Sequence, residues 1–388
     1  MTAEVEPEGT ASRLQYGLIS VDDHVQEPPD LWTARLSHSH FGDRVPRLDR
    51  SDEGTDRWVA DGHVLLDGHA ARAAALMPER NQEPVRWDEV PAAAYRPRAR
   101  LKVMDEAGVD CSVLYPTVAG FSGEAFAGLR DPDLELACVQ AYNDWLIDEW
   151  AAASDRFIPQ CIVPVWPVDA TVAEIRRAVG RGHRGVIFPS VPMDLRDVPH
   201  PAGPEWDPVW STCEELDVPL CLHAGGSPRL QNALPPGLSP TLSAALDAVQ
   251  KPVSTVFVLG LFIFSRVLLR HPRLKVVFAE SALSWSMLYL EWADHQAEHD
   301  GLAREGYHLT PLEMFHRQCY VDAWYDEVAP FASYIGADHI LWSTNLPLAT
   351  SSWPHTRGEI ARCFDGVSIA DRQRVLWRNA AELYRLQT

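Results

Sequence analysis

Short apolar runs of the length of buried β-strands recur along the chain, and stretches with apolar residues at helical spacing separate them. The eight predicted strands cover 18–21, 110–115, 157–165, 185–189, 218–223, 274–279, 319–322 and 339–343. The predicted helices cover 132–153, 170–179, 206–216, 242–271, 283–299, 357–363 and 368–383. This alternation of buried strands and helices is typical of an all-parallel sheet that helices cover.

Eight strands is also the number that closes a (β/α)8 barrel, whose chemistry lies at the carboxyl ends of the strands. We therefore predict an α/β fold of the TIM-barrel type. An open doubly wound sheet is the alternative, and it is disfavoured because no GxGxxG motif follows a strand.

A long segment, 30–98, separates the first two strands and is rich in Pro, Asp, Arg and Gly. It is too long for a simple connection, so we expect an inserted, cap-like segment that shapes a pocket at the barrel mouth. Within it, 58–68 has the pattern of a small hairpin. Just after it, 100–107 predicts a short helix that ends at Gly108.

Ligand-type side chains follow the first strand directly, before two prolines: Asp22, Asp23, His24 and Glu27. Because side chains alternate along a strand, Asp22 and His24 point to the same face and Asp23 to the opposite one. A carboxylate oxygen and an imidazole nitrogen on one face can bind one divalent cation. The alternative is a turn with solvated acids and an incidental histidine.

Two further ligand-type residues stand at strand ends: His223 closes the fifth strand and Glu280 follows the sixth. Strand ends meet at one rim of a barrel, so we predict that both residues join Asp22 and His24 in a metal site. A buried structural histidine is the alternative for His223. A buried, unpaired carboxylate is costly, so we also expect a cationic group near Glu280.

Composition limits the partners and the compartment. The formal net charge of −20 argues against nucleic acid and anionic membrane surfaces. Seven Cys without CxxC spacing indicate reduced thiols, and 1–13 lacks the features of a signal peptide. The longest apolar stretch, 253–264, is too short to span a bilayer. We therefore expect a cytoplasmic protein that acts on a small molecule, with 1–13 as a flexible tail and 14–388 as one domain.

Several segments together resemble the amidohydrolase superfamily, specifically the amidohydrolase family 2 branch of metal-dependent hydrolases and decarboxylases. These segments are ISVDDHVQEPPDLW, MDEAGVDCSVLYPT, ACVQAYNDWLIDEW, CLHAGG, HPRLKVVFAES and SSWPHTR. The resemblance covers about 18–384 and implies a distorted TIM barrel with one or two divalent metal ions (Zn, Fe or Mn). It implies Asp22, His24 and His223 as ligands. Glu280 stands where related enzymes carry His or Glu, and a homodimer is common among related proteins.

The chain departs from this resemblance at the end of the eighth strand, where the branch usually carries an Asp in a D-Y-P-H segment. Asn345 takes the place of that Asp, and Leu348 takes the place of the His. The Asp commonly binds metal and acts as the general base, whereas an Asn cannot accept a proton at neutral pH. The remaining candidates for a base or a further ligand are Glu280, Asp23, Glu27, His295 and His299. His295 and His299 lie on one helix face with a spacing that can bind metal, and a solvated helix end is the favoured interpretation of both.

The function expected first is a metal-dependent hydrolase that cleaves a carboxylic ester, thioester or amide of a small organic substrate with a metal-activated water. A non-oxidative decarboxylase or C–C lyase of the same family is the alternative. A further alternative is a non-catalytic barrel that lost its base with Asn345.

Other residues are candidates for substrate binding, each with a structural alternative. Arg98 and Arg100 could bind a substrate carboxylate, or they could be paired helix residues. His355 follows the loop after strand eight and could line the pocket. The aromatic residues near strand ends could form an apolar pocket or pack in the core: Trp32, Tyr115, Phe121, Trp166, Phe188 and Trp285.

Overall fold

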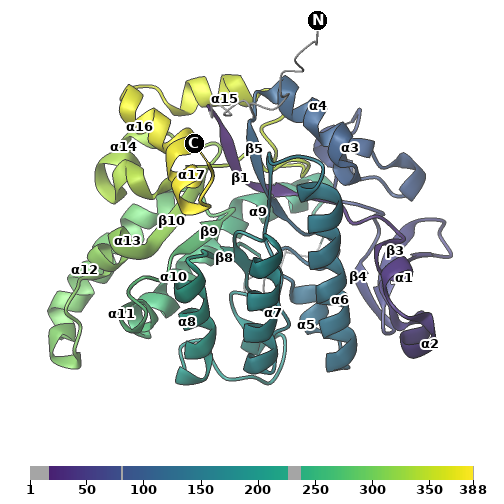
Figure 1. Cartoon of the computed structure of the whole chain (residues 1–388). Coiled ribbons are helices and arrows are strands. Elements are labelled where there is room, and N and C mark those ends of the chain that lie inside the picture. Colours follow the sequence, from purple (N-terminus) through teal and green to yellow (C-terminus); the bar gives the residue numbers. More distant parts are fainter. Residues whose placement is uncertain (1–16, 80–81, 226–236, 388) are drawn as a thin grey trace, which may run out of the picture.

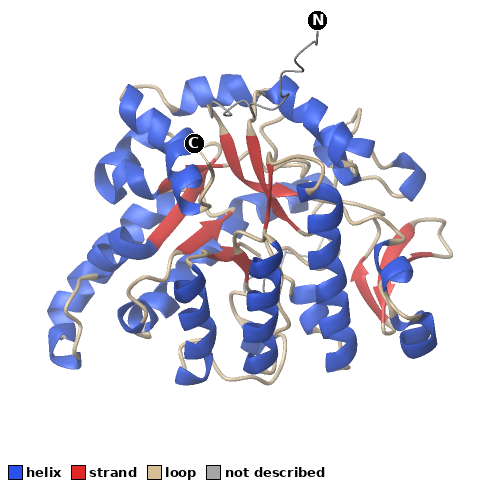
Figure 2. Cartoon of the chain, viewed as in Figure 1, coloured by secondary structure: helices blue, strands red, loops and turns tan. Residues whose placement is uncertain are grey.

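The computed structural model describes residues 17–79, 82–225 and 237–387, so the expected tail 1–13 lies outside the described residues. Eight parallel strands form its centre, in two sheets with the orders β1-β5-β6 and β11-β10-β9-β8-β7. Figures 1 and 2 show these strands enclosed by helices. The strands are β1 (Ile19–His24), β5 (Cys111–Tyr115), β6 (Phe157–Pro159), β7 (Val186–Ile187), β8 (Leu220–His223), β9 (Val276–Ala279), β10 (Cys319–Ala323) and β11 (Ile340–Trp342).

The two sheets meet along both of their edges. A single parallel bridge between Cys161 and Val186 joins the end of β6 to β7. On the other side, the Asn345 N–H donates to the Asp22 carbonyl oxygen at 2.9 Å, and the His24 N–H donates to Leu346 O at 2.7 Å. The fold is therefore the distorted (β/α)8 barrel that the sequence predicts.

The α-helices follow the predicted pattern, with short additional ones in loops. They are α1 (Leu31–Arg35), α2 (His38–Phe41), α3 (Ala92–Tyr95), α4 (Pro97–Ala107), α5 (Glu124–Ala127), α6 (Pro132–Trp145), α7 (Val168–Arg181), α8 (Asp207–Leu216), α9 (Pro240–Gln250), α10 (Ser254–Phe264), α11 (Val267–Arg270), α12 (Ser284–Asp300), α13 (Pro311–Gln318), α14 (Val328–Phe331), α15 (Thr356–Cys363), α16 (Ile369–Gln373) and α17 (Asn379–Leu383).

Several predicted elements differ in extent from the observed ones, the third strand among them. The third strand is predicted over 157–165 but β6 ends at Pro159, because Pro159 and Pro164 have no N–H to donate to a neighbouring strand. The apolar stretch 253–264 is the second half of a continuous helical run, Thr241–Phe264, in which a 3₁₀ turn at Lys251–Val253 separates α9 from α10. By length and composition this helix could cross a membrane, and 28% of its most apolar window is buried.

The inserted segment contains an antiparallel sheet of β2 (Arg47–Arg50), β3 (Asp56–Ala60) and β4 (His63–Leu66), which includes the predicted hairpin. Trp58 on β3 is fully buried, and its ring meets that of Trp32 edge to face at 5.8 Å. The Trp58 indole N–H donates to Ala70 O at 2.8 Å. The small sheet therefore shares the hydrophobic core of the barrel.

Another part of the insertion lies at the carboxyl ends of the barrel strands. The Ala75 N–H donates to Pro347 O at 3.1 Å, in the loop after β11. The Gln26 N–H, just after β1, donates to Ala94 O at 2.9 Å. These contacts place the segment beside the rim where the predicted site lies, which is where a cap would be needed.

Replacing Trp58 with Ala should lower the free energy of unfolding by about 3–5 kcal/mol, because a buried aromatic ring is lost from the shared core. Val64→Ala on the neighbouring β4 is the control, since Val64 is 49% exposed, and it should change stability by less than about 0.5 kcal/mol. Urea unfolding followed by tryptophan fluorescence and circular dichroism measures both. Equal, small effects would show that the insertion packs separately from the barrel.

Candidate metal centre

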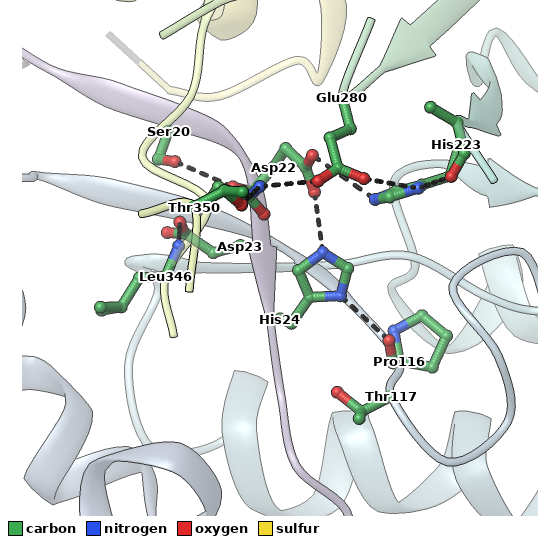
Figure 3. A network of polar contacts seen from close by, with 12 residues as sticks. Ser20, Asp22, Asp23, His24, Pro116, Thr117, His223, Glu280, Leu346 and Thr350 are labelled. Atoms are coloured by element: carbon green, nitrogen blue, oxygen red, sulfur yellow. Dashed lines mark hydrogen bonds and ion pairs between the residues drawn. The ribbon is translucent and has the colours of Figure 1, made fainter. Parts of the chain in front are cut away.

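Three ligand-type side chains converge at the carboxyl ends of β1 and β8: Asp22, His24 and His223 (Figure 3). One ligand atom from each lies within 4.8 Å of the others, and all three residues are buried. His24 Nε2 lies 3.4 Å from Asp22 Oδ1, and His223 Nε2 lies 3.5 Å from Asp22 Oδ2. Strand alternation brings Asp22 and His24 to one face, and barrel closure brings His223 to them.

The converging atoms are those that a metal ion would use. Both carboxylate oxygens of Asp22 and the Nε2 atoms of His24 and His223 are buried without a hydrogen-bond partner among the described residues. Buried polar atoms are almost always satisfied, and leaving them unpaired is costly. A divalent cation would satisfy all of these atoms at once, so the residues fit a metal ion.

The other nitrogen of each imidazole sets its tautomer. His24 Nδ1 lies 3.1 Å from Pro116 O, and His223 Nδ1 lies 2.7 Å from Ala224 O. A carbonyl oxygen can only accept, so each Nδ1 carries the hydrogen and donates it. Both Nε2 lone pairs are then directed at the centre, which is the usual arrangement of histidine ligands.

The electrostatics of the centre favour a cation. Burial by itself would raise the pKa of Asp22, but the two imidazoles hold it well below its usual range. Burial lowers the pKa of His223, but the Asp22 carboxylate, with a smaller contribution from Glu280, raises it to about 9. The Asp22 carboxylate therefore favours a cation beside it. Before metal binding this cation is His223 with a second proton, on Nε2, and a bound metal ion would displace that proton and use the Nε2 lone pair.

Glu280 lies beside this group of three rather than within it. Its Oε2 is 3.8 Å from His223 Nδ1, the nitrogen that faces away from Asp22. Its Oε1 accepts a hydrogen bond from Asn345 Nδ2 at 3.0 Å. The expected cation is present, since Lys251 Nζ lies 3.8 Å from Glu280 Oε2. Oε2 is buried and has no hydrogen-bond partner among the described residues, which leaves it open to a ligand.

Asn345 connects three parts of the rim. Its backbone is in the left-handed region, with φ of 54°, and its N–H donates to Asp22 O at 2.9 Å. Its side-chain Nδ2 donates to Glu280 Oε1 and, at 2.7 Å, to Thr350 Oγ1. An Asp here would place a second carboxylate against Glu280, so the Asn at 345 and the Glu at 280 suit each other.

Asp322, at the end of β10, belongs to the site but is not among the predicted residues. It accepts hydrogen bonds from Ser281 N at 2.9 Å, Ser281 Oγ at 3.1 Å and Glu280 N at 3.3 Å. Burial, with the charge of Asp22, raises its pKa to about 7. Glu280 has a positive φ of 51°, and Asp322 holds this strained turn in place. Its position at the end of the seventh strand is the signal that could have identified it.

The structure places Asp23 and Glu27 away from the converging atoms. Asp23 accepts from Thr344 Oγ1 at 2.6 Å and Leu346 N at 2.9 Å, so it fixes the loop after β11. Glu27 accepts from Val118 N at 2.9 Å in the loop after β5, and burial raises its pKa to about 7. Both carboxylates are occupied by backbone or hydroxyl donors, so they position loops instead of serving the metal.

The two helix histidines and two of the predicted substrate contacts are on the surface. His295 and His299 are exposed on α12, where His299 pairs with Asp300 at 3.0 Å. Arg98 is exposed on α4, and His355 is exposed at the start of α15. None of these side chains joins the group of three, so the surface interpretation fits them better than a role in the site.

Arg100 is fully buried, and Nε and Nη2 donate inside the protein, whereas Nη1 has no hydrogen-bond partner among the described residues. Nε donates to Ala93 O and Nη2 to His24 O, each at 2.7 Å, and the guanidinium lies 5.5 Å from the Trp150 ring. The positive charge also faces Asp23. Arg100 therefore fixes the end of β1, which fits the alternative of a paired helix residue better than substrate binding.

Among the aromatic candidates, two rings contact the site histidines. The Phe121 ring lies 4.5 Å from that of His24 and 5.0 Å from that of His223. The Tyr115 ring lies 5.2 Å from that of His223. Phe188 is buried against Trp206 at 5.2 Å, and Trp166, half-buried, contacts Trp206 at 5.9 Å. Phe188 and Trp166 therefore belong to core packing.

The fold and the site together define a (β/α)8 barrel enzyme with a candidate divalent-metal centre. A sequence model of the amidohydrolase family matches residues 36–386. The chain therefore belongs to the amidohydrolase family.

Similar proteins share this fold over nearly the whole chain. A gamma-resorcylate decarboxylase from a Rhizobium species is 26% identical over 314 residues, which cover 74% of this chain and 86% of that protein. An amidohydrolase structure from Mycobacterium avium subsp. paratuberculosis has a TM-score of 0.75 at 22% identity, covering 96% of this chain and 100% of its own. A dihydroxybenzoic acid decarboxylase from a Polaromonas species, with bound manganese and 2-nitroresorcinol, has a TM-score of 0.62 at 18% identity, covering 96% and 98%. The name of the 26% identical relative fits decarboxylation, the alternative expectation, better than the hydrolysis expected first.

Replacing either His24 or His223 with Ala should lower the bound Mn²⁺ at least tenfold, because each substitution removes one of three converging ligands. His295→Ala is the matched control, since this exposed histidine lies on α12, and it should leave the metal content unchanged. Elemental analysis after loading with Mn²⁺ and desalting measures all three. Full metal content in both ligand variants would contradict the site.

Replacing Arg100 with Met should lower the free energy of unfolding by about 3–5 kcal/mol, because it leaves the buried Asp23 carboxylate without its facing charge. Arg98→Met removes an exposed charge from the same helix and should change stability by less than about 0.5 kcal/mol. Urea unfolding compares the two. A stable Arg100→Met protein with weakened substrate binding would restore the original expectation.

Proposed function

We propose that this protein is a metal-dependent, non-oxidative decarboxylase of a small aromatic carboxylic acid. The observation that carries the proposal is the pairing of the three converging ligands with Glu280, whose unpartnered Oε2 lies beside them, while Asn345 occupies the position of the usual base. The decarboxylase names of similar proteins support the same chemistry. The seven buried, free cysteines support the cytoplasm as its compartment.

Decarboxylation proceeds in two steps at the site, protonation of a carbon and cleavage of a C–C bond. The carbon that bears the carboxylate must receive a proton, and the C–C bond then breaks to release CO₂. A divalent ion held by Asp22, His24 and His223, such as the Mn²⁺ bound by the Polaromonas relative, would supply a positive charge that binds and polarises anionic oxygens of the substrate.

Glu280 is the group we assign to proton transfer. Its Oε1 is held by Asn345, so the carboxyl has a fixed orientation, and its Oε2 is buried without a hydrogen-bond partner among the described residues. In its acid form Glu280 gives its proton to the ring carbon, and it regains one from solvent after CO₂ leaves. The overall reaction consumes one proton for each carboxylate lost.

The aromatic rings at the site suit an aromatic substrate. Phe121 contacts both site histidines, and Tyr115 contacts His223. Flat apolar rings beside a cation site bind flat, anionic molecules better than flexible ones. The 2,6-dihydroxybenzoate bound by a solved decarboxylase of similar fold is of this class.

The direct test incubates the Mn²⁺-loaded protein with hydroxybenzoates that carry ¹³C in the carboxylate, together with their methyl esters and thioesters. We expect ¹³CO₂ from at least one acid and, in D₂O, one deuterium at the vacated ring carbon of the product. Ester or thioester cleavage without release of CO₂ would overturn the proposal in favour of hydrolysis.

Replacing Asn345 with Asp should lower the decarboxylation rate at least tenfold. The substitution replaces a donor 3.0 Å from Glu280 Oε1 with a second carboxylate, and two such groups cannot both ionise. Thr350→Val is the control, because it removes the other partner of Asn345 without adding charge, and it should cost no more than about threefold. Steady-state rates on the best acid measure both. A gain of activity in Asn345→Asp would show a site that had lost its base.

A further inference from the structure

Lys251 reaches the metal centre from an element that carries none of the other site residues. It begins the 3₁₀ turn Lys251–Val253 between α9 and α10. Its Nζ lies 3.8 Å from Glu280 Oε2 and 5.7 Å from the centre of the Phe121 ring. The chain has only two other lysines. Lys102 is exposed on α4, and Lys275 pairs with Asp217 at 2.8 Å.

The Lys251 side chain lies along the backbone of Gly225. Gly225 follows the ligand His223 by two residues and has a φ of 80°. A Cβ at Gly225 would lie 3.5 Å from both Cγ and Cδ of Lys251. The methylene stem therefore lies against bare backbone next to a metal ligand, and it carries the ammonium to the side of the site where Phe121 and Glu280 meet.

The Lys251 ammonium donates no hydrogen bond to either of the two carboxylates beside it. Its contacts with Glu280 and with Asp247 are both 3.8 Å, which is longer than a hydrogen bond. Among the residues that the structure describes, Nζ has no partner within hydrogen-bond distance. The side chain is 23% exposed, so it faces both the buried Glu280 and solvent. An ammonium whose three donors have no hydrogen-bond partner among the described residues, at the edge of a cation site, is suited to an anionic ligand.

We propose that Lys251 binds the carboxylate of the substrate and so makes the site selective for aromatic monocarboxylates over neutral aromatics and esters. This inference rests on the proposed function, since a decarboxylase must hold a carboxylate beside its proton donor. With the carboxylate at Lys251 Nζ, the adjoining ring carbon lies next to Glu280. Once CO₂ has left, the product carries no carboxylate, so this contact is lost and release is favoured.

The test measures binding and turnover separately, in the full-length, Mn²⁺-loaded protein and its Lys251→Met and Lys251→Arg variants. Titration calorimetry gives the Kd of 2,6-dihydroxybenzoate and of resorcinol, the same ring without a carboxylate. In Lys251→Met, we expect binding of the carboxylate to weaken about 30-fold while that of resorcinol changes less than twofold, because only the charged contact is lost. Lys251→Arg should recover most of the carboxylate binding.

Turnover should show the same selectivity. KM for the carboxylate should rise about 30-fold in Lys251→Met, with a smaller fall in kcat. Lys275→Met removes a lysine with the same change of charge outside the site, and it should match the parent in every measurement. Manganese content and melting temperature are measured for each variant, so that a loss of folding or of metal is recognised.

The outcomes separate this inference from the proposed function. If the parent protein prefers the carboxylate through Lys251 but releases no CO₂, the inference about Lys251 stands and the proposed decarboxylase function is wrong. If the parent protein releases CO₂ and the Lys251→Met variant keeps the same preference for the carboxylate over resorcinol, the inference about Lys251 is wrong and the proposed function stands. Equal weakening of both ligands in Lys251→Met, or a parent with no preference for the carboxylate, also overturns the inference, because Lys251 would then only support the structure.

Discussion

The Asp22 carboxylate is the constraint on which the rest of the site depends. It is buried between two imidazoles, and neither oxygen has a hydrogen-bond partner among the described residues. Such a charge is stable in the interior only with a cation. The backbone carbonyls that take the Nδ1 hydrogens of His24 and His223 are needed for the same reason, because they direct both Nε2 lone pairs toward the carboxylate.

A second layer of the site is built around Glu280. Asn345 fixes one oxygen of Glu280, and Lys251 and His223 face the other. Asp322 holds the turn from which Glu280 projects. A carboxyl placed between an amide and an ammonium, at the edge of a metal centre, suits proton transfer to a bound anion better than activation of water by the missing Asp.

The alternation of apolar strands and helices along the chain predicted the barrel. The ligand-type residues at strand ends predicted that Asp22, His24 and His223 meet. Alternation along one strand and the shared rim of parallel strands are enough for both. Lys251 was missed because it lies in a helix–helix turn, and only the fold brings that turn over Gly225. The role of Arg100 stayed open because a helical pattern does not say which face meets the end of β1. Strand lengths were overestimated where prolines such as Pro159 interrupt pairing.

The most direct measurement is anomalous X-ray diffraction at the manganese edge from crystals of the Mn²⁺-loaded protein. The central claim is that one buried centre, made by Asp22, His24 and His223, holds a divalent ion. The account predicts a single strong anomalous peak in contact with an Asp22 oxygen and with Nε2 of both histidines. A peak elsewhere, or no peak among these residues in metal-saturated crystals, would contradict it.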